Sequence, residues 1–515
     1  PALTAEAFEA GQLAQVSATS QALTGMAARF AGGSDALAAL VREQQDTFNR
    51  WQVLDAELVK ASSKPPKSRN SQEDAARLQE LAALDRRLKE LGERLVREFP
   101  RYAEIVSPRP VPLAEAQRLL APDEALLVWS IGDEASFLWA VRQDRAMVAR
   151  LSIGAKGLEA AVRGLRAALD PSVGIQGGRW PRFDTQAAYA LYRQILAPAE
   201  PVIAGARHLL VIPDGALQSL PLGVLVTQAP ARPIAEYRDY RQVPWLMRRY
   251  AMSVLPSVSA LPALRGYSAP AQAKQPFAGI GDPVLEGQGE RARAVNVAGL
   301  FRGASVDVAL LRQLPPLPEA ADELRAEARL LGAGESDLYL RERATVPRVM
   351  QANLRDYRVV AFATHAAVGG ELEGLAEPAL VMTPPAQASE QDDGLLTASR
   401  VAQLKLDADW VVLSACNTAA GDGTPGAEGL SGLAKAFFYA GTRAVLVSHW
   451  PVFSKAAVKL TTTAFEAMAK EPRLGRAQAL QKAMLSMVDS DNEPLLGHPM
   501  LWAPFVIVGE GAPGR

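Results

Sequence analysis

The first hundred residues carry apolar side chains at helical spacing and little else. Leu84, Leu88 and Leu91 recur every three or four positions and draw one apolar stripe that continues to Phe99. A second stripe runs through residues 36–59, and the polar, proline-bearing stretch between the two stripes indicates a loop. We predict a long antiparallel helical hairpin within residues 1–105. It acts either as a packing or spacer element or as an arm that binds a partner.

From residue 109 the pattern changes to short apolar runs separated by helical stretches. Gly132 and Asp133 split the first two runs, as expected for a β-hairpin. A later run, His208–Pro213, ends at an Asp-Gly turn. Strands mixed with helices indicate an α/β unit over residues 109–268. The predicted strands cover 126–129, 137–141 and 208–213, and the predicted helices cover 158–169 and 189–196.

The last unit, residues 276–511, alternates strands and helices more regularly. Its strands are almost continuously apolar, as in Trp410–Ser414 (WVVLS), which is typical of strands that are buried on both faces. We predict a mainly parallel sheet flanked by helices, so the chain is of the α/β class. The predicted strands cover 277–280, 357–363, 410–414, 444–448 and 505–508, and the predicted helices cover 318–331, 430–439, 455–469 and 478–487.

Composition removes several function classes. The 515-residue chain carries 55 basic and 56 acidic residues, and a net charge of −1 provides no field for nucleic acid or an anionic membrane. No apolar run reaches the roughly 18 residues that a membrane-spanning helix needs. The sequence opens on Pro1 without a leader pattern, so we expect a processed chain or an expressed fragment, and the compartment stays open.

The cysteine and histidine content narrows the chemistry further. The chain has one cysteine, which allows neither an internal disulfide nor a cysteine-based metal site. Its four histidines are scattered and lack the spacing of a zinc site. The sequence contains no phosphate-binding loop, no nucleophile elbow and no complete dinucleotide fingerprint. We therefore expect neither a metal nor a cofactor.

Two reactive side chains directly follow predicted strands. If strands 357–363 and 410–414 are parallel neighbours, His365 and Cys416 lie at the same edge of the sheet, where ligands bind in such folds. The two residues are 51 positions apart, and caspases place their histidine about 50 residues before their cysteine. We interpret His365 as a general base and Cys416 as a nucleophile.

The chemistry explains why these residue types are paired. A free thiol is only a few per cent ionised at neutral pH, so a neighbouring imidazole must take its proton. The reaction also needs backbone N–H donors for the oxyanion, and we assign them to Ala366 and Cys416. Small residues after each reactive group leave that backbone open. Asn417, next to the nucleophile, is a candidate substrate contact.

Several stretches then resemble one family, the CHAT domain. They are 208–222 (HLLVIPDGALQSLPL), 363–365 (ATH), 393–397 (DGLLT), 411–418 (VVLSACNT), 428–430 (EGL), 447–452 (VSHWPV) and the closing His498-Pro499. The resemblance covers roughly residues 180–509. It implies a caspase-like fold of the separase-related kind, with a His–Cys dyad and no metal, in which a degenerate unit at 109–268 precedes the active one.

The resemblance also implies how a substrate is held. In caspase-like enzymes the strand end after the cysteine-bearing helix pairs with the substrate main chain, a role that falls on Ser448, His449 and Trp450. Relatives commonly wait for a protein partner or effector to order the cleft loops, so the resemblance implies a latent enzyme. Ala366 stands where relatives usually have glycine, and it keeps a backbone donor.

Phe453 and Ser454 stand where many relatives have acidic residues. Acidic groups in nearby loops, at Asp422, Glu428 or Glu371, are the alternative source of charge, so the choice between a basic and an apolar side chain before the cut stays open. The predicted function is a cysteine endopeptidase acting on protein or peptide substrates. The alternative is a catalytically silent caspase-fold module that binds a partner through its helical arm.

Overall fold

A computed structural model provides the three-dimensional structure. It describes residues 2–13, 71–98, 110–175, 180–230, 232–267, 271–287, 301–302, 305–367, 378–389, 391–414 and 432–512, together with residues 40, 43, 44, 47, 48, 50, 51, 54 and 58.

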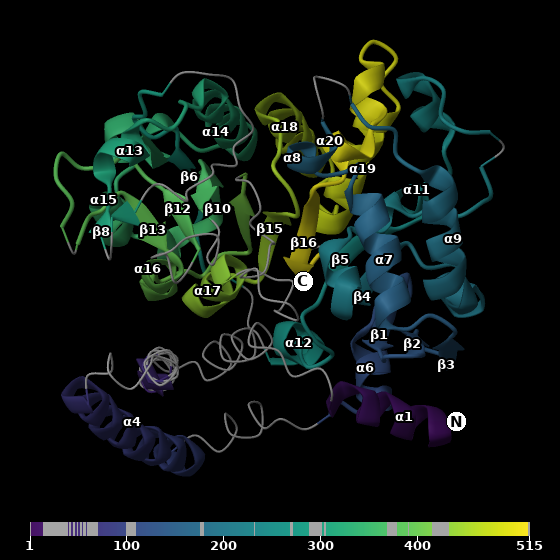
Figure 1. Cartoon of the computed structure of the whole chain (residues 1–515), viewed down its shortest axis with the longest axis horizontal. Helices are drawn as coiled ribbons and strands as arrows, with labels where there is room; N and C mark the ends of the chain where they lie inside the picture. Colours follow the sequence, from purple (N-terminus) through teal and green to yellow (C-terminus); the bar gives the residue numbers. More distant parts are fainter. Residues whose placement is uncertain are drawn as a thin grey trace.

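One 11-stranded sheet runs through the molecule (Figure 1). Its strands, in spatial order, are β3 (Ala146–Leu151), β2 (Ser136–Val141), β1 (Glu124–Ile131), β4 (His208–Ile212), β5 (Ala251–Val254), β16 (Phe505–Gly509), β15 (Ala444–Ser448), β14 (Trp410–Leu413), β10 (Tyr357–Ala363), β6 (Gln275–Gly281) and β9 (Leu338–Leu340).

The sheet consists of two parallel blocks that run in opposite directions. β1, β4, β5 and β16 are parallel to one another, and β15, β14, β10, β6 and β9 form the second block. The blocks meet where β15 pairs antiparallel with β16, and the antiparallel strands β2 and β3 complete the other end. Because parallel strands end at a common edge, the ends of β10, β14 and β15 lie together.

Two core clusters cover the two faces of the sheet. Alternate strand residues point to opposite faces, so Leu127 and Trp129 lie in the first cluster and Leu126 and Val128 in the second. The first face carries α7 (Ala155–Arg166), α9 (Thr185–Ile195), α10 (Glu200–Ile203), α11 (Leu246–Arg249), α14 (Pro318–Leu331), α18 (Ser454–Lys470), α19 (Arg476–Val488) and α20 (Pro499–Trp502). The second face carries α1 (Ala2–Leu13), α6 (Leu113–Leu119), α12 (Ala260–Pro262), α15 (Val346–Gln351), α16 (Ala398–Gln403) and α17 (Gly432–Ala440).

A small antiparallel sheet follows β10. It contains β11 (Ala366–Ala367), β12 (Ala379–Val381) and β13 (Leu395–Thr397), and α13 (Val308–Arg312) packs against it through Leu311. The remaining short elements are α8 (Pro171–Gly174), β7 (Phe301–Arg302) and β8 (Ser305–Val306). The small sheet matters for the site because it holds the backbone that leaves the end of β10.

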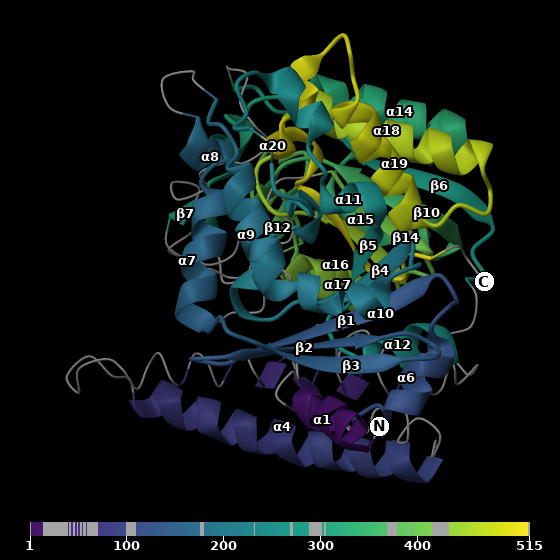
Figure 2. The ribbon, with the colours of Figure 1, turned by 90° about the vertical axis from the view of Figure 1, so that its right-hand side faces the viewer.

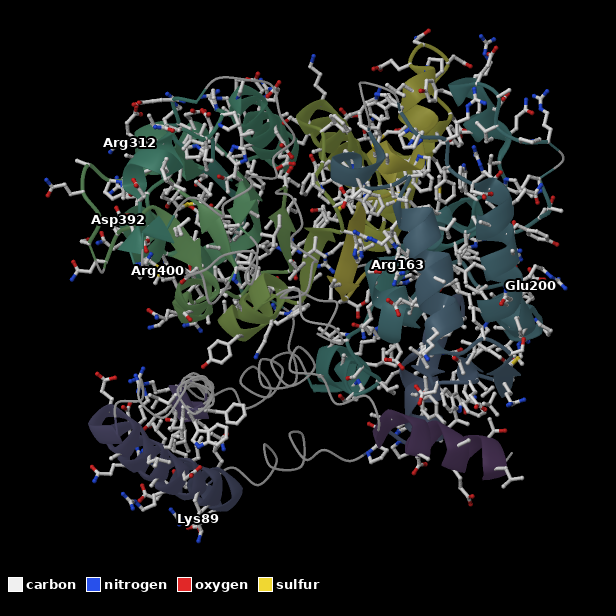
Figure 3. The ribbon with its side chains drawn as sticks, viewed as in Figure 1. Lys89, Arg163, Glu200, Arg312, Asp392 and Arg400 are labelled. Carbon is white, nitrogen blue, oxygen red and sulfur yellow. The ribbon has the colours of Figure 1, made fainter. Side chains whose placement is uncertain are left out.

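Of the predicted N-terminal hairpin, the structure describes the second helix, α4, and single residues of the first. In α4 (Ser71–Glu98), Leu91 and Leu95 are buried, and Lys89 lies on the outer surface (Figure 3). Arg87 pairs with Glu43, and Arg50 pairs with Glu80 at 2.9 Å. As residue numbers rise from 43 to 50, the numbers of their partners in α4 fall from 87 to 80, the order expected of antiparallel segments. Most of residues 36–59 lie outside the described residues, so the hairpin stays a prediction.

α1 packs against β3 and α6 (Figure 2). Its Phe8 is almost fully buried in the second core cluster. The side-chain Nε2 of Gln12 donates to the carbonyl of Val111 at 2.9 Å, and the Val111 N–H donates to Gln12 Oε1 at 2.8 Å. The start of the chain is thereby tied to the sheet.

The structure confirms the predicted fold class, a mainly parallel α/β sheet flanked by helices. All eight strands named from the apolar pattern occur, with bounds that differ by a few residues. In the 11-stranded sheet the pattern missed β3, β5 and β9, and outside it the short strands β7, β8, β11, β12 and β13. Missing β5 matters most for the predicted domains. The pairing of β5 with β16 joins strands from the predicted units 109–268 and 276–511 into one sheet. The bounds of those two units stay a prediction.

Candidate active site

His365 lies two residues beyond β10, at the edge where the second block of parallel strands ends. The residue is fully buried. Its Nε2 lies 2.8 Å from the carbonyl oxygen of Pro315. A carbonyl can only accept, so Nε2 carries the hydrogen, and Nδ1 is the basic nitrogen of the neutral ring.

The small sheet fixes the backbone around this histidine. The Val381 N–H donates to the His365 carbonyl at 2.9 Å, and the Thr364 hydroxyl donates to the Val381 carbonyl at 2.5 Å. Hydrogen-bonded pairs alternate with non-bonded pairs in an antiparallel ladder. Because His365 and Val381 form a bonded pair, the next pair, Ala366 and Leu380, is non-bonded. The Ala366 N–H therefore points away from β12.

β14 is the parallel neighbour of β10, as the sequence predicts. Val359 pairs with Trp410 and Phe362 with Leu413, so paired residues are 51 positions apart. The Ser414 N–H continues this register by donating to the Phe362 carbonyl at 2.8 Å. Cys416 and Asn417 follow directly and lie outside the described residues.

The segment after β15 is well packed. Ser448 and Trp450 are fully buried, and the Trp450 indole donates to the Met500 carbonyl at 3.0 Å. The His449 main chain is engaged on both sides: its N–H donates to the Pro504 carbonyl at 2.9 Å, and its carbonyl accepts from Arg166 at 3.1 Å. The His449 N–H is therefore already bonded within the protein, and a substrate strand would have to displace the Pro504 carbonyl to use it.

Arg166 is a residue that the sequence analysis missed. It ends α7, on the other side of the sheet junction, and also donates to the Ser219 carbonyl. Its guanidinium carbon lies 5.8 Å from the Trp450 ring centroid. Burial lowers the pKa of Arg166 below its usual value, although Asp170 opposes this. The two contacting residues are 283 positions apart, and no local pattern marks that pairing.

The His449 imidazole has its own environment. The residue is 7% exposed, and burial, with a smaller effect from the positive charge of Arg166, lowers the pKa of the ring to about 3. The imidazole is therefore neutral at physiological pH. It lines a cavity between β5 and α19.

Asp282 closes β6 at the same edge as His365. Its backbone φ of 45° is unusual for a residue other than glycine, and its N–H donates to the Ala363 carbonyl at 3.2 Å. Burial raises the pKa of this carboxyl, and Arg341 opposes the rise from 3.6 Å. The sequence pattern Gly-Asp-Pro indicated only a turn here.

Of the residues considered for choosing the side chain before the cut, the structure describes only some. The Phe453 ring stacks on Trp180 with centroids 5.2 Å apart. The acidic candidates Asp422, Glu428 and Glu371 lie outside the described residues. Within the described part of the chain, no cluster of three or more histidine, cysteine or acidic side chains is arranged for a metal ion. No helix in that part combines the length and hydropathy of a membrane span.

Comparison with solved structures finds distant similarity. The separase–securin complex of Saccharomyces cerevisiae matches 90% of this chain and 38% of that chain, at 10% identity and a TM-score of 0.42. The complex of Porphyromonas gingivalis RgpB pro- and mature domains matches 70% of this chain and 77% of that chain, at 10% identity and a TM-score of 0.34.

Sequence comparison is more specific. Tetratricopeptide repeat protein 28 from Mus musculus is 32% identical over an alignment of 228 residues, and the match covers 38% of this chain and 9% of that protein. The Homo sapiens protein of the same name matches at the same identity over 8% of its length. The chain thus spans less than a tenth of these relatives. The CHAT domain family model matches residues 185–510, more than half of the chain, and the protein belongs to the CHAT domain family.

Proposed function

We propose that this protein is a cysteine endopeptidase in which His365 is the general base and Cys416 the nucleophile. The supporting observation is the register of β10 and β14. Each paired residue of β10 has its partner in β14 51 positions later in the sequence, and Cys416 likewise comes 51 positions after His365. Each therefore lies three residues past the last pair, Phe362 and Leu413. If the two strands continue in the same direction past that pair, the imidazole and the thiol lie close together.

The hydrogen bond from His365 to Pro315 supports the same roles. It places a hydrogen on Nε2, so we assign to Nδ1 the role of taking the proton of the Cys416 thiol. The thiolate then attacks a peptide carbonyl. The imidazolium returns the proton to the leaving amine, and water releases the acyl-enzyme. The outward Ala366 N–H and the Cys416 N–H are the proposed oxyanion donors.

The proposed enzyme is latent in this conformation. His365 is fully buried, and the His449 main chain is already bonded to Pro504 and Arg166. A substrate strand therefore requires a rearrangement at this edge, for which an activating protein partner is the proposed trigger. Protein or peptide substrates, with no nucleic acid, membrane or cofactor, complete the proposal.

The burial of His365 also favours a second candidate function. A caspase-fold module that has lost turnover has no need for an accessible base, and it binds a protein through its helical hairpin. Cys416 would then be an ordinary thiol whose reactivity does not depend on His365.

A proteome-derived peptide library, read by mass spectrometry, tests the proposal. Wild type should produce cuts that disappear in Cys416→Ala and fall at least a hundredfold in His365→Ala. Arg163→Ala, at an exposed position on α7, is the matched control and should cut like wild type.

Thiol labelling separates the two functions without turnover. Cys416 is the only cysteine of the chain, so a peptide chloromethyl ketone reports on it alone. Wild type should react much faster than His365→Ala near pH 7, because only the former has an activated thiol. Equal labelling rates, with no Cys416-dependent cuts in the presence of candidate partners, would favour the silent module.

A further inference from the structure

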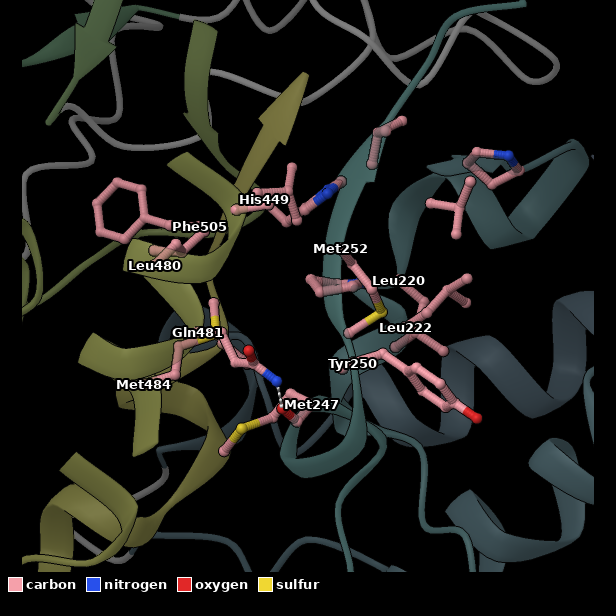
Figure 4. A pocket seen from close by; sticks show the side chains of 18 of the residues that line it. Leu220, Leu222, Met247, Tyr250, Met252, His449, Leu480, Gln481, Met484 and Phe505 are labelled. Carbon is pink, nitrogen blue, oxygen red and sulfur yellow. Dashed lines mark hydrogen bonds between the residues drawn. The ribbon is translucent and has the colours of Figure 1, made fainter. Parts of the chain in front are cut away.

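An apolar cavity lies at the junction of the two parallel blocks, and the proposed chemistry does not use it. Its volume is about 90 Å³. Figure 4 shows Leu480 and Met484 of α19 on one side of it, and Met252 and Leu222 on the other. The two walls come from segments more than 200 residues apart, so the cavity exists only in the assembled sheet.

Among the residues that the structure describes, no aspartate, glutamate, lysine or arginine lines this cavity. The Gln481 amide at its wall already donates to the Met247 carbonyl at 2.7 Å (Figure 4). A charged guest would lose its hydration without gaining a counter-charge, which is costly in an apolar site. The lining therefore selects uncharged guests.

His449 supplies a polar side chain at the wall of the cavity. It is more than nine-tenths buried and lines the cavity, and its ring nitrogens make no hydrogen bond with the part of the chain that the structure describes. A neutral imidazole has one N–H donor and one acceptor nitrogen, and a ligand that displaces water from the cavity costs least when it replaces the hydrogen bonds that water can make with them. A ligand with one polar group can therefore bind this ring while its remaining part contacts the mainly apolar lining.

We propose that the cavity binds an uncharged ligand that has a short apolar chain and one hydrogen-bonding group, such as an alcohol, ketone or amide. The apolar chain of the ligand lies between α19 and β5, and its polar group forms a hydrogen bond with the His449 imidazole. This inference is independent of the proposed peptidase, because binding is measured without turnover.

Methionine methyl NMR measures this binding directly. The chain has ten methionines, and Met247, Met252 and Met484 line the cavity. In the full chain labelled with methyl-¹³C methionine, 1-pentanol should shift these three signals saturably, with a Kd of roughly 1 mM. Pentanoate and pentylammonium have the same chain with a charge, and they should bind at least tenfold more weakly.

Variants test the geometry. His449→Phe keeps a ring and removes both nitrogens, so it should weaken 1-pentanol about tenfold and leave benzene binding within twofold. Leu480→Trp should fill the cavity and abolish both, whereas Ser486→Trp, at an exposed position of the same helix, should retain both.

Three results would overturn the proposal: equal binding of the alcohol and the two ions, shifts that do not saturate or that spread over all methionines, or unchanged pentanol affinity in His449→Phe. Any of these would leave the cavity as a space for water alone. If Leu480→Trp does not fold, the His449→Phe comparison still decides the outcome.

Discussion

At the scale of single residues, His498 is an imidazole that the fold keeps neutral. Its Nε2 lies 2.8 Å from the Pro181 carbonyl, and its Nδ1 accepts the Met500 N–H at 3.1 Å. Tyr240 packs on it edge to face, with ring centroids 5.1 Å apart. Burial lowers the pKa of this ring to about 4, and the hydrogen bond to Pro181 opposes that shift.

This environment predicts acid sensitivity. The unfolded chain binds a proton at His498 near pH 6.5, whereas the folded chain binds it only near pH 4. The stabilising contribution is therefore complete above pH 6.5 and is lost as the pH falls from 6.5 to 4. From pH 7 to pH 5 we expect the free energy of unfolding to fall by about 2 kcal/mol through this residue.

Urea denaturation at pH 7 and pH 5 measures the effect. His498→Gln should show a drop in unfolding free energy that is about 2 kcal/mol smaller than that of wild type. Tyr237→Phe, which keeps a ring beside His498, should retain the full drop. Identical pH dependence in wild type and His498→Gln would show that the imidazole is protonated equally in both states.

At the scale of elements, one buried cluster of charges joins the strands of the first block. Arg265 follows β5, Glu124 begins β1 and Glu510 follows β16. The Arg265 guanidinium bonds Glu124 at 2.5 and 2.8 Å and Glu510 at 2.7 and 2.8 Å. Burial would raise the pKa of Glu124, but His208 and Arg265 outweigh it and hold that pKa well below its usual range.

Removing the cation from this cluster should be costly. Arg265→Met leaves the buried carboxylate of Glu124 and the partly buried carboxylate of Glu510 without this partner, and we expect it to lower the free energy of unfolding by about 3–5 kcal/mol at pH 7. Arg163→Met removes only the exposed pair with Glu159 and should change the unfolding free energy by at most about 0.5 kcal/mol.

Chemical denaturation of both variants, monitored by circular dichroism, makes this comparison. Adding Glu124→Gln and Glu510→Gln to Arg265→Met removes the uncompensated charge and should recover part of the loss. A cost for Arg265→Met no greater than that for Arg163→Met would mean that the cluster does not hold the strands together.

At the scale of the whole molecule, β5 and β16 make the two strand blocks one body. Ile507 pairs with Ser253 and Val508 with Val254, and the first core cluster contains residues from both blocks. Separating the blocks would expose strand edges and the apolar residues between them. We therefore expect β4 and β14 to unfold in the same cooperative step, although they lie in different predicted units.

Native-state hydrogen exchange across a denaturant series tests this expectation. Amides of β4 and β14 should converge on one opening free energy and one denaturant slope, because they open in the same event. α4, which has fewer buried residues, should open at a lower free energy and is the internal comparison. A lower opening free energy for β4 than for β14 would establish independent units.

The amino-acid sequence by itself determined the fold class and the eight most strongly apolar strands. Strands such as Trp410–Ser414 are continuous apolar runs, and a strand buried on both faces needs that pattern whatever its neighbours are. The positions of His365 and Cys416 just past two strands followed from the same local signal. The structure confirms that those strands are parallel neighbours, and the pairing of the two side chains stays a proposal.

Tertiary structure alone decided how distant segments meet. β5 is a four-residue strand with a polar Ser253, too short to stand out in the pattern, and only its pairing with β4 and β16 makes it part of the sheet. The contact of Arg166 with His449, the carbonyl of Pro315 beside His365, and the cavity under α19 likewise join residues far apart along the chain. Local periodicity describes a segment's own faces, whereas such contacts depend on which buried surfaces fit together once the sheet has formed.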